Sequence, residues 1–179
     1  SAGTFTAAGV ETVNVKTSLV ASTLTDISAS SATKLTVSGD TALTITNAQT
    51  TATIDASDMT AALTVKLGAA AHTITGGAAA DSFDMQGNLA FADTIDGGAG
   101  ADTLSVSASA AINATAGTGA LVNVSNVETI QMNSTGDAAS IDMTGVTGVT
   151  SLEAASNVGV FGAAGTNEGI GDTFGYTLN

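Results

Sequence analysis

Apolar and polar residues alternate in short segments along much of the chain. The clearest segments begin at Thr33 (TKLTVSG), Thr41 (TALTITN), Thr51 (TATIDAS), Ala61 (AALTVKL) and Ala71 (AHTITGG). Successive side chains of a β-strand point to opposite faces, so this period of two predicts strands with one buried face. Thr and Val are β-branched and favour extended backbone, and no long helical pattern competes. We therefore expect an all-β fold with little helix.

One large apolar residue recurs in each segment at intervals of 8 to 12 residues; the series is Val37, Ile45, Ile54, Val65, Ile74, Phe83, Ile95, Leu104 and Ile112. A period near nine accommodates a short strand and a turn. Two topologies have this period: an antiparallel meander with tight hairpins, and a coil with two strands per turn. The Asn-Gly or Asp-Gly signature of tight hairpins occurs only at Asp96-Gly97. The pattern thus favours a parallel β-solenoid.

The alternation also predicts the direction of side chains. Besides the recurring apolar residues, four positions are expected to point inward: Leu35, Leu43, Ala52 and Leu63. Five threonines are expected to point outward: Thr36, Thr44, Thr53, Thr64 and Thr73. The segments GVETVNV from Gly9 and SNVETIQM from Ser125 are predicted as longer strands, and residues 118–119 and 159–175 as loops.

Composition narrows the possible chemistry. The 179 residues include no Cys, no Trp and one His, so nucleophilic and soft-metal chemistry are nearly excluded. Three Lys and Arg against 16 Asp and Glu give a net charge of −13, which repels nucleic acid and anionic membranes and favours cations as partners. Aromatic residues make up only 3%, which suits a narrow interior. No apolar run approaches the roughly 20 residues that span a bilayer, so we expect no membrane insertion.

The segment GGAGADTLS, from Gly97 to Ser105, matches the nonapeptide pattern GGxGxDxUx, in which U is a large apolar residue. Glycines permit a tight turn whose carbonyl oxygens converge, Asp102 supplies a carboxylate, and Leu104 anchors the next strand. Calcium prefers about 6 to 8 oxygen ligands, so a neighbouring turn must complete the site. The competing interpretation is a flexible glycine-rich loop with a solvated aspartate.

Two imperfect copies of the pattern precede this segment. Residues 76–84 have Ala79 in place of the third glycine, and residues 88–96 keep only Asp93 and Ile95, while the insertion 85–87 breaks the register. We expect Asp81, Asp93 and Asp102 to be aligned, with Asp84 and Asp96 at the turn entrances, and one or two Ca²⁺ ions to bind. The candidate ligands are Gly76, Gly77, Asp81, Asp84, Asp93, Asp96, Gly97, Gly98, Gly100 and Asp102.

At this motif the chain resembles bacterial RTX-type secreted proteins. Its ladder rich in Ala, Thr, Ser and Gly, with NVETI from Asn126 and TIDASDMTAALTV from Thr53 to Val65, is similar in style to the RTX-type S-layer proteins of Gram-negative bacteria. The resemblance implies a right-handed β-solenoid, type I secretion directed by a C-terminal signal, and calcium-dependent lattice assembly at the cell surface. One elongated domain is then expected over 1–179: a Thr-rich ladder (1–75), calcium turns (76–105), and further strands and loops (106–179).

Catalysis is not expected. His72 occupies an inward position and lacks partners for base chemistry, and the glutamates at 11, 128, 153 and 168 lie in unrelated contexts. Ice binding by the outward threonines is disfavoured because Asp55 and Lys66 interrupt that face. The expected function is a structural surface layer built from copies of the chain. Two alternatives remain: an adhesin, for which a cell-surface glycan is a candidate partner, and a calcium-dependent folding domain of a larger secreted protein.

Overall fold

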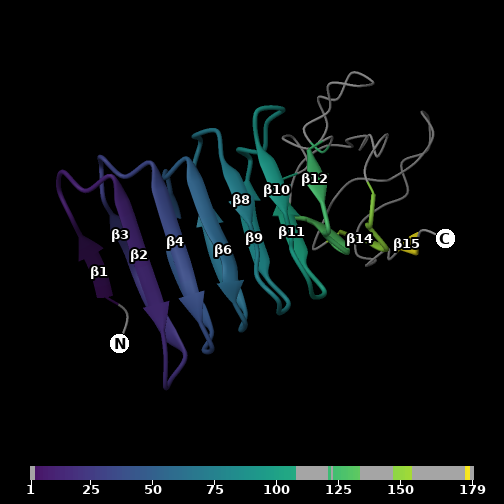
Figure 1. The fold of residues 1–179 in the computed structure, drawn as a ribbon. Coiled ribbons are helices and arrows are strands. Elements are labelled where there is room, and N and C mark those ends of the chain that lie inside the picture. The colour runs from purple at the N-terminus through teal and green to yellow at the C-terminus, as the bar shows by residue number, and fades with distance from the viewer. Residues whose placement is uncertain (1–2, 108–120, 122, 134–146, 155–175, 178–179) are drawn as a thin grey trace.

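The protein is described by a computed structural model, which covers residues 3–107, 121, 123–133, 147–154 and 176–177. These residues form an elongated β-solenoid of two sheets, with no helix among them (Figure 1). One sheet has nine strands: β1 (Gly3–Thr6), β3 (Ser22–Ser28), β5 (Leu43–Gln49), β7 (Leu63–Leu67), β9 (Ser82–Gln86), β11 (Thr103–Val106), β13 (Thr129–Met132), β14 (Ser151–Ala154) and β15 (Tyr176–Thr177). The other has six: β2 (Thr12–Thr17), β4 (Lys34–Gly39), β6 (Thr53–Met59), β8 (Thr73–Thr75), β10 (Thr94–Asp96) and β12 (Val124–Ser125).

Through β13, each turn of the chain contributes one strand to each sheet. A strand pairs in parallel with the strand one turn later, and the antiparallel pair β14 and β15 is the exception. Paired strand residues of successive turns are 18 to 22 positions apart in the regular part of the solenoid. This topology confirms the predicted two-strand coil and contradicts the hairpin meander.

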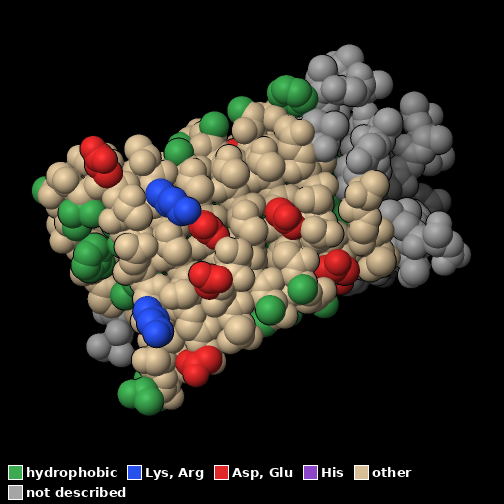
Figure 2. All heavy atoms as spheres, in the orientation of Figure 1, with side chains coloured by type: hydrophobic (Ala, Val, Ile, Leu, Met, Phe, Trp, Pro, Cys, Tyr) green, Lys and Arg blue, Asp and Glu red, His purple; other side chains and the backbone are tan. Residues whose placement is uncertain are grey.

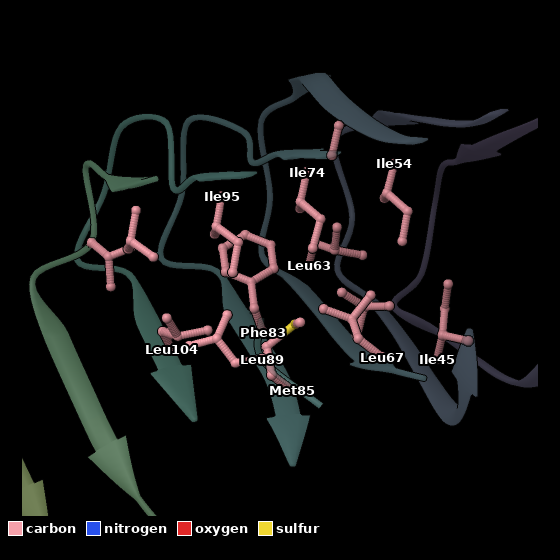
Figure 3. Packing of buried hydrophobic residues seen from close by; sticks show 14 of the residues in the cluster. Ile45, Ile54, Leu63, Leu67, Ile74, Phe83, Met85, Leu89, Ile95 and Leu104 are labelled. Carbon is pink, nitrogen blue, oxygen red and sulfur yellow. The ribbon is translucent and has the colours of Figure 1, made fainter. Parts of the chain in front are cut away.

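The core consists of apolar side chains on the inner faces of the two sheets, where the sheets meet, and a strand such as β4 or β9 contributes two of them (Figure 3). The recurring apolar residues from Val37 to Leu104 are almost fully buried, as are Leu35, Leu43 and Leu63; Ile112 lies outside the described residues. The five threonines predicted to face outward are half-buried or exposed. Alternating residues therefore place apolar side chains inside and hydroxyls outside, as the sequence predicted.

Two predictions about strands are wrong. Ala52 is exposed and Thr51 takes the buried position at that corner, because the alternation begins again only at Thr53, where β6 starts. The segment from Ser125 is not one strand: β12 ends at Ser125, and a corner at residues 126–128 leads to β13. The loops predicted at 118–119 and 159–175 lie outside the described residues. Within the described part of the chain, no apolar helix long enough to cross a membrane is found.

Candidate functional site

The segments 76–81 and 97–102 lie directly on top of each other in successive turns. The Gly76 amide donates to the Asp96 carbonyl at 2.8 Å, and the Ala99 amide donates to the Gly77 carbonyl at 2.9 Å. The 85–87 insertion does not break this stacking: the register shifts beside Gln86, which has a positive φ of 52°, and Met85 stays buried. The two glycine-rich turns are thus neighbours in space.

The glycines of this stack are required by the close approach of the turns. A Cβ atom on Gly97 would overlap the carbonyl oxygen of Asn126, one turn later, and would lie 2.6 Å from Oδ2 of Asp102. A Cβ on Gly76 would likewise overlap the carbonyl oxygen of Gly97. Any side chain at these positions would push the turns apart, so the glycine pair of the motif is explained by packing of backbone on backbone.

Three carboxylates form a column beside the stacked turns. We call Asp81, Asp102 and Glu128 the acidic column. Asp81 accepts through Oδ1 from the Leu63 amide at 2.7 Å and through Oδ2 from the Gly77 amide at 2.6 Å. Asp102 accepts through Oδ1 from the Asp81 amide, and Glu128 accepts through Oε2 from the Asp102 amide, both at 2.7 Å. Each carboxylate therefore satisfies a backbone donor of the preceding turn.

One oxygen of the acidic column lacks a partner. Asp102 is fully buried, and its Oδ2 atom accepts no hydrogen bond. Burial raises the pKa of Asp102 to about 6; the amide of Asp81 works against this rise, and the negative charges of Asp81, Glu128 and Asp96 add to it. Burial also raises the pKa of Asp81, against the hydrogen bonds from Gly77 and Leu63. The column is therefore a buried concentration of negative charge with an unused acceptor.

Asp93 does not join this column, contrary to the predicted alignment. Its carboxylate accepts from the His72 amide and from the Ala90 amide, each at 2.7 Å, at the corner that precedes the six-stranded sheet. Consecutive units of about nine residues lead into strands of alternate sheets. The unit that contains Asp93 therefore lies on the other side of the solenoid from the units that contain Asp81 and Asp102. Asp81 and Asp102 are brought together because a full turn of 21 residues separates them.

The two remaining predicted acidic ligands, Asp96 and Asp84, lie at different distances from the acidic column. Asp96, at the end of β10, lies beside the column and accepts through Oδ1 from the Gly98 amide at 3.1 Å and the Asn126 side-chain amide at 2.7 Å. Asp84 lies within β9 on the half-exposed outer face, in register with Lys66 of β7. Asp96 can contribute charge to the site, whereas Asp84 faces away from it.

His72 is buried, and hydrogen bonds hold its ring. Nδ1 lies 2.9 Å from the Thr51 carbonyl oxygen, and Nε2 lies 3.3 Å from that of Gly68. This confirms the predicted inward position and gives His72 a structural contact with the preceding turn.

Sequence reasoning missed Glu128 as a member of the column, although a signal was present that Glu11 and Asp93, which precede strands of the other sheet, also share. Asp81, Asp102 and Glu128 each begin a tripeptide of acid, hydroxyl residue and large apolar residue, namely DSF, DTL and ETI. Each tripeptide leads into a strand of the nine-stranded sheet. Asp102 and Glu128 are 26 residues apart, whereas Asp81 and Asp102 are 21 apart, so the sequence spacing did not indicate that Glu128 holds the equivalent position.

The atoms of this site that could bind a metal ion are carboxylate and carbonyl oxygens, which are hard ligands. Among the described residues, no group of three or more His, Cys, Asp or Glu side chains converges in a metal-binding arrangement. A cation at the column would therefore need backbone carbonyl oxygens in addition to carboxylates, which is the kind of mixed oxygen set that calcium accepts. Comparisons of the chain with protein-family models, with curated proteins and with solved structures find no match.

Proposed function

We propose that the protein is a structural scaffold of an extracellular surface layer, built from copies of the chain and stiffened by calcium at the acidic column. The observation that carries the proposal is the unpartnered Oδ2 of Asp102, which is buried in the second of two stacked glycine-rich turns, where the negative charges of Asp81, Glu128 and Asp96 act on it.

The scaffold part is supported by the shape and the surface. The solenoid extends along one axis, and the two sheets present rows of half-exposed hydroxyl side chains; one row contains Thr23, Thr44, Thr64, Ser82, Thr103, Thr129 and Ser151 in register. A stack of this kind gains length by repeating one local interaction, since each turn contacts only its neighbours. Such a rod suits a structural layer.

The calcium part is supported by the charge balance. Carboxylates brought together in a buried place repel one another, and a divalent cation offsets the repulsion when it binds. Asp81 and Asp102 would hold the ion together with backbone carbonyls of the 76–81 and 97–102 turns, and Glu128 and Asp96 would add negative charge nearby. When bound, calcium supplies positive charge and cross-links two turns. The protein residues orient the carboxylates, because backbone amides already fix one oxygen of Asp102 and both of Asp81.

The calcium part is tested by substituting the buried carboxylate. Asp102→Asn keeps an oxygen that can accept from the Asp81 amide but removes the charge. In excess chelator this variant should melt above the native protein, since the repulsion is gone; with calcium at 100 times its dissociation constant, the native protein should gain about 2.7 kcal/mol and the variant far less. Thermal melts by circular dichroism and calorimetric titration with Ca²⁺ measure both effects.

Asp84→Asn is the matched control, because it removes the same charge from the outer face of β9. It should retain the native response to calcium. If the native protein binds no calcium, or if Asp102→Asn responds to it as fully as the native protein does, the calcium part of the proposal is wrong.

The scaffold part is tested by electron microscopy of the purified chain in calcium. Ordered two-dimensional arrays or extended assemblies are the expected result. Dispersed monomers at every calcium and protein concentration would contradict self-assembly.

A further inference from the structure

The N-terminal end of the solenoid has two uncovered strands among the described residues. β1 ends the nine-stranded sheet and β2 ends the six-stranded sheet (Figure 1). The Ala7 amide, just after β1, donates to the Ser28 carbonyl of β3. The Glu11 carbonyl, just before β2, accepts from the Thr33 amide beside β4. Because backbone groups alternate in direction along a strand, those at the even positions point toward the open edge: Thr4 and Thr6 in β1, and Thr12, Asn14 and Lys16 in β2.

The same even positions carry the outward side chains. Phe5 is in register with Ile27, which is buried, and Val13 is buried itself, so the odd positions of both strands form the inner row. The even positions of both strands are exposed. A strand added at either edge must match inner side chains with inner side chains and turn its free backbone groups toward that edge. β1 and β2 meet both conditions for each other in antiparallel pairing, because even positions then face even positions.

Apolar side chains gather on this first turn. Four of the five large apolar side chains that are exposed in the described residues belong to it: Phe5 at 45%, Val10 at 38%, Leu19 at 93% and Val20 at 69%. The fifth, Phe91 at 55%, lies in a loop far along the chain. In every later turn the equivalent surface is covered by the preceding turn, so the end surface of the first turn has the composition of an uncompleted core.

Charge favours contact between two N-terminal ends. Residues 3–21, which form the first turn, contain one acidic and one basic residue, Glu11 and Lys16. From residue 68 onward the sequence has eleven acidic residues and no lysine or arginine. Figure 2 shows basic side chains only toward the N-terminal end of the visible face, while acidic ones continue along it. Two first turns can therefore meet without the like-charge repulsion that opposes contacts of the acidic part.

The N-terminal end of the coil also has a step. β2 follows β1 by half a turn of the chain, so β1 lies farther out along the solenoid axis, and the two strands run in opposite directions (Figure 1). A two-fold rotation about an axis parallel to the strands exchanges the two sheets of a second copy and reverses the order of its levels. The protruding β1 of each copy then lies against the recessed β2 of the other, in antiparallel orientation. The two steps are therefore complementary.

We propose that two copies of the chain bind each other through their N-terminal ends about this two-fold axis, with β1 of each copy pairing antiparallel with β2 of the other. Both copies use the same surface, so the contact closes and gives a dimer. The outer faces of the sheets stay free for the further contacts of a layer. The dimer joint deepens the self-assembly part of the proposed function, on which it rests, and it is independent of calcium binding.

The register of the joint follows from the corner that connects the two strands. Residues 7–11 join Thr6 to Thr12, so these two residues lie at the same level along the strand direction. The two-fold rotation keeps that level. The resulting pairs across the joint are Thr6 with Thr12, Thr4 with Asn14, and Phe5 with Val13. The first two pairs form hydrogen bonds at the open edges, and the third continues the apolar core from one copy into the other.

Cysteine cross-linking tests the register, because the chain has no cysteine of its own. In a hydrogen-bonded antiparallel pair the Cα atoms are about 5.5 Å apart, which a disulfide can span. When full-length Thr4→Cys and Asn14→Cys chains are mixed and oxidised in chelator, we expect the mixed disulfide to predominate over both symmetric ones. Thr36→Cys is the matched control for Asn14→Cys, because Thr36 is in register with Asn14 one turn farther from the end, and it should not link to Thr4→Cys.

A double variant tests whether the contact closes. The chain with both Thr4→Cys and Asn14→Cys should stop at a dimer that contains two disulfides. A ladder of larger products would overturn the two-fold joint, because it would show that each copy binds a different neighbour at each position.

A second comparison measures the apolar contact. Phe5→Lys should lower the dimerisation constant by at least tenfold in sedimentation experiments in chelator, whereas Phe91→Lys, the same change at a similarly exposed side chain away from the edge, should leave it unchanged. Unchanged melting curves show that both variants fold. Predominant 4–4 or 14–14 disulfides, or dimers that tolerate Phe5→Lys, would overturn the joint and leave the scaffold proposal standing. A chain that stays monomeric in chelator and in calcium would overturn both.

Discussion

The first turns of the solenoid and the central turns share the same two sheets and the same apolar core. They differ in the side chains that form hydrogen bonds at the buried corners between strands. In residues 3–75 the buried corner groups are mostly uncharged side chains. The Thr17 hydroxyl donates to the Thr41 carbonyl at 2.6 Å, and the Gln49 amide donates to Asp26 at 3.0 Å and to the Asn47 carbonyl at 2.9 Å.

Between residues 76 and 133, carboxylates accept the hydrogen bonds at the described corners. The acidic column accepts them on one side of the solenoid and Asp93 on the other. A carboxylate accepts strongly from backbone amides, but stacking several of them in a buried place adds repulsion that uncharged groups do not have. We therefore expect cations to affect the stability of the second region more than that of the first.

The largest loss of stability is expected when a side chain is added where the glycine-rich turns pack closely on each other. Gly97→Ala would place a methyl group on the Asn126 carbonyl and against Asp102, and should cost on the order of 2–4 kcal/mol of unfolding free energy. Hydrogen exchange should show lost protection in β9 to β11 and retained protection in β4 to β7. Gly3→Ala, which meets no atom within 4 Å, is the control. Equal loss of protection in both regions would show that they unfold as one unit.

A smaller effect, opposite in sign in the two regions, is expected from pH. Asp102 has a raised folded pKa of about 6, so the folded state binds its proton more tightly than the unfolded state does. In chelator, stability should rise as the pH falls from about 6 toward about 4, by a few degrees in melting temperature. Asp102→Asn should remove this gain, and a flat native profile over that range would contradict the buried charge.

Asp55, in the first region, has the reverse behaviour. Its pKa is lowered by hydrogen bonds from Ser57 and then from Lys34, so its contribution is present above its ordinary pKa of 3.8 and is lost as the pH falls through the lower folded pKa. The two carboxylates therefore act in separate pH windows. Melts of Asp55→Asn should therefore lie below those of the native protein above this ordinary pKa and converge with them at the acidic end of the profile.

The smallest effect is expected from the Lys34–Asp55 ion pair at 2.9 Å. Both side chains are partly exposed, at 43% and 30%, so Lys34→Met should change the unfolding free energy by no more than about 0.5 kcal/mol. Urea denaturation measures the change, and calcium should not alter it. A loss several times larger would mean that the first region also depends on charge.

The strands and the core were predictable from the sequence because a period of two and a recurrence near nine are local properties. Each of the apolar residues from Val37 to Leu104 is buried as expected, and the matched nonapeptide does form a tight turn with positive φ at Gly98 and Gly100.

The composition of the column was not predictable from the nonapeptide alone. Which turns become neighbours depends on the length of a full turn, and that length changes along the chain. Asp93 was expected in the column because its unit follows Asp81 in sequence, yet the half-turn between them carries it to the other side. Glu128 was not expected because 26 residues separate it from Asp102. Ala52 was misplaced because alternation does not continue through a corner.

The one-way direction of the corner hydrogen bonds gives the rod a structural polarity. In the central turns the donor belongs to the earlier turn and the acceptor to the later one, so an earlier turn is completed only after the following residues have folded against it. Trimming the chain from its C-terminal side would strand a buried amide without an acceptor, whereas trimming from the N-terminal side would merely release a carboxylate into water. Shortened versions of this protein should therefore tolerate loss of initial turns better than loss of later ones.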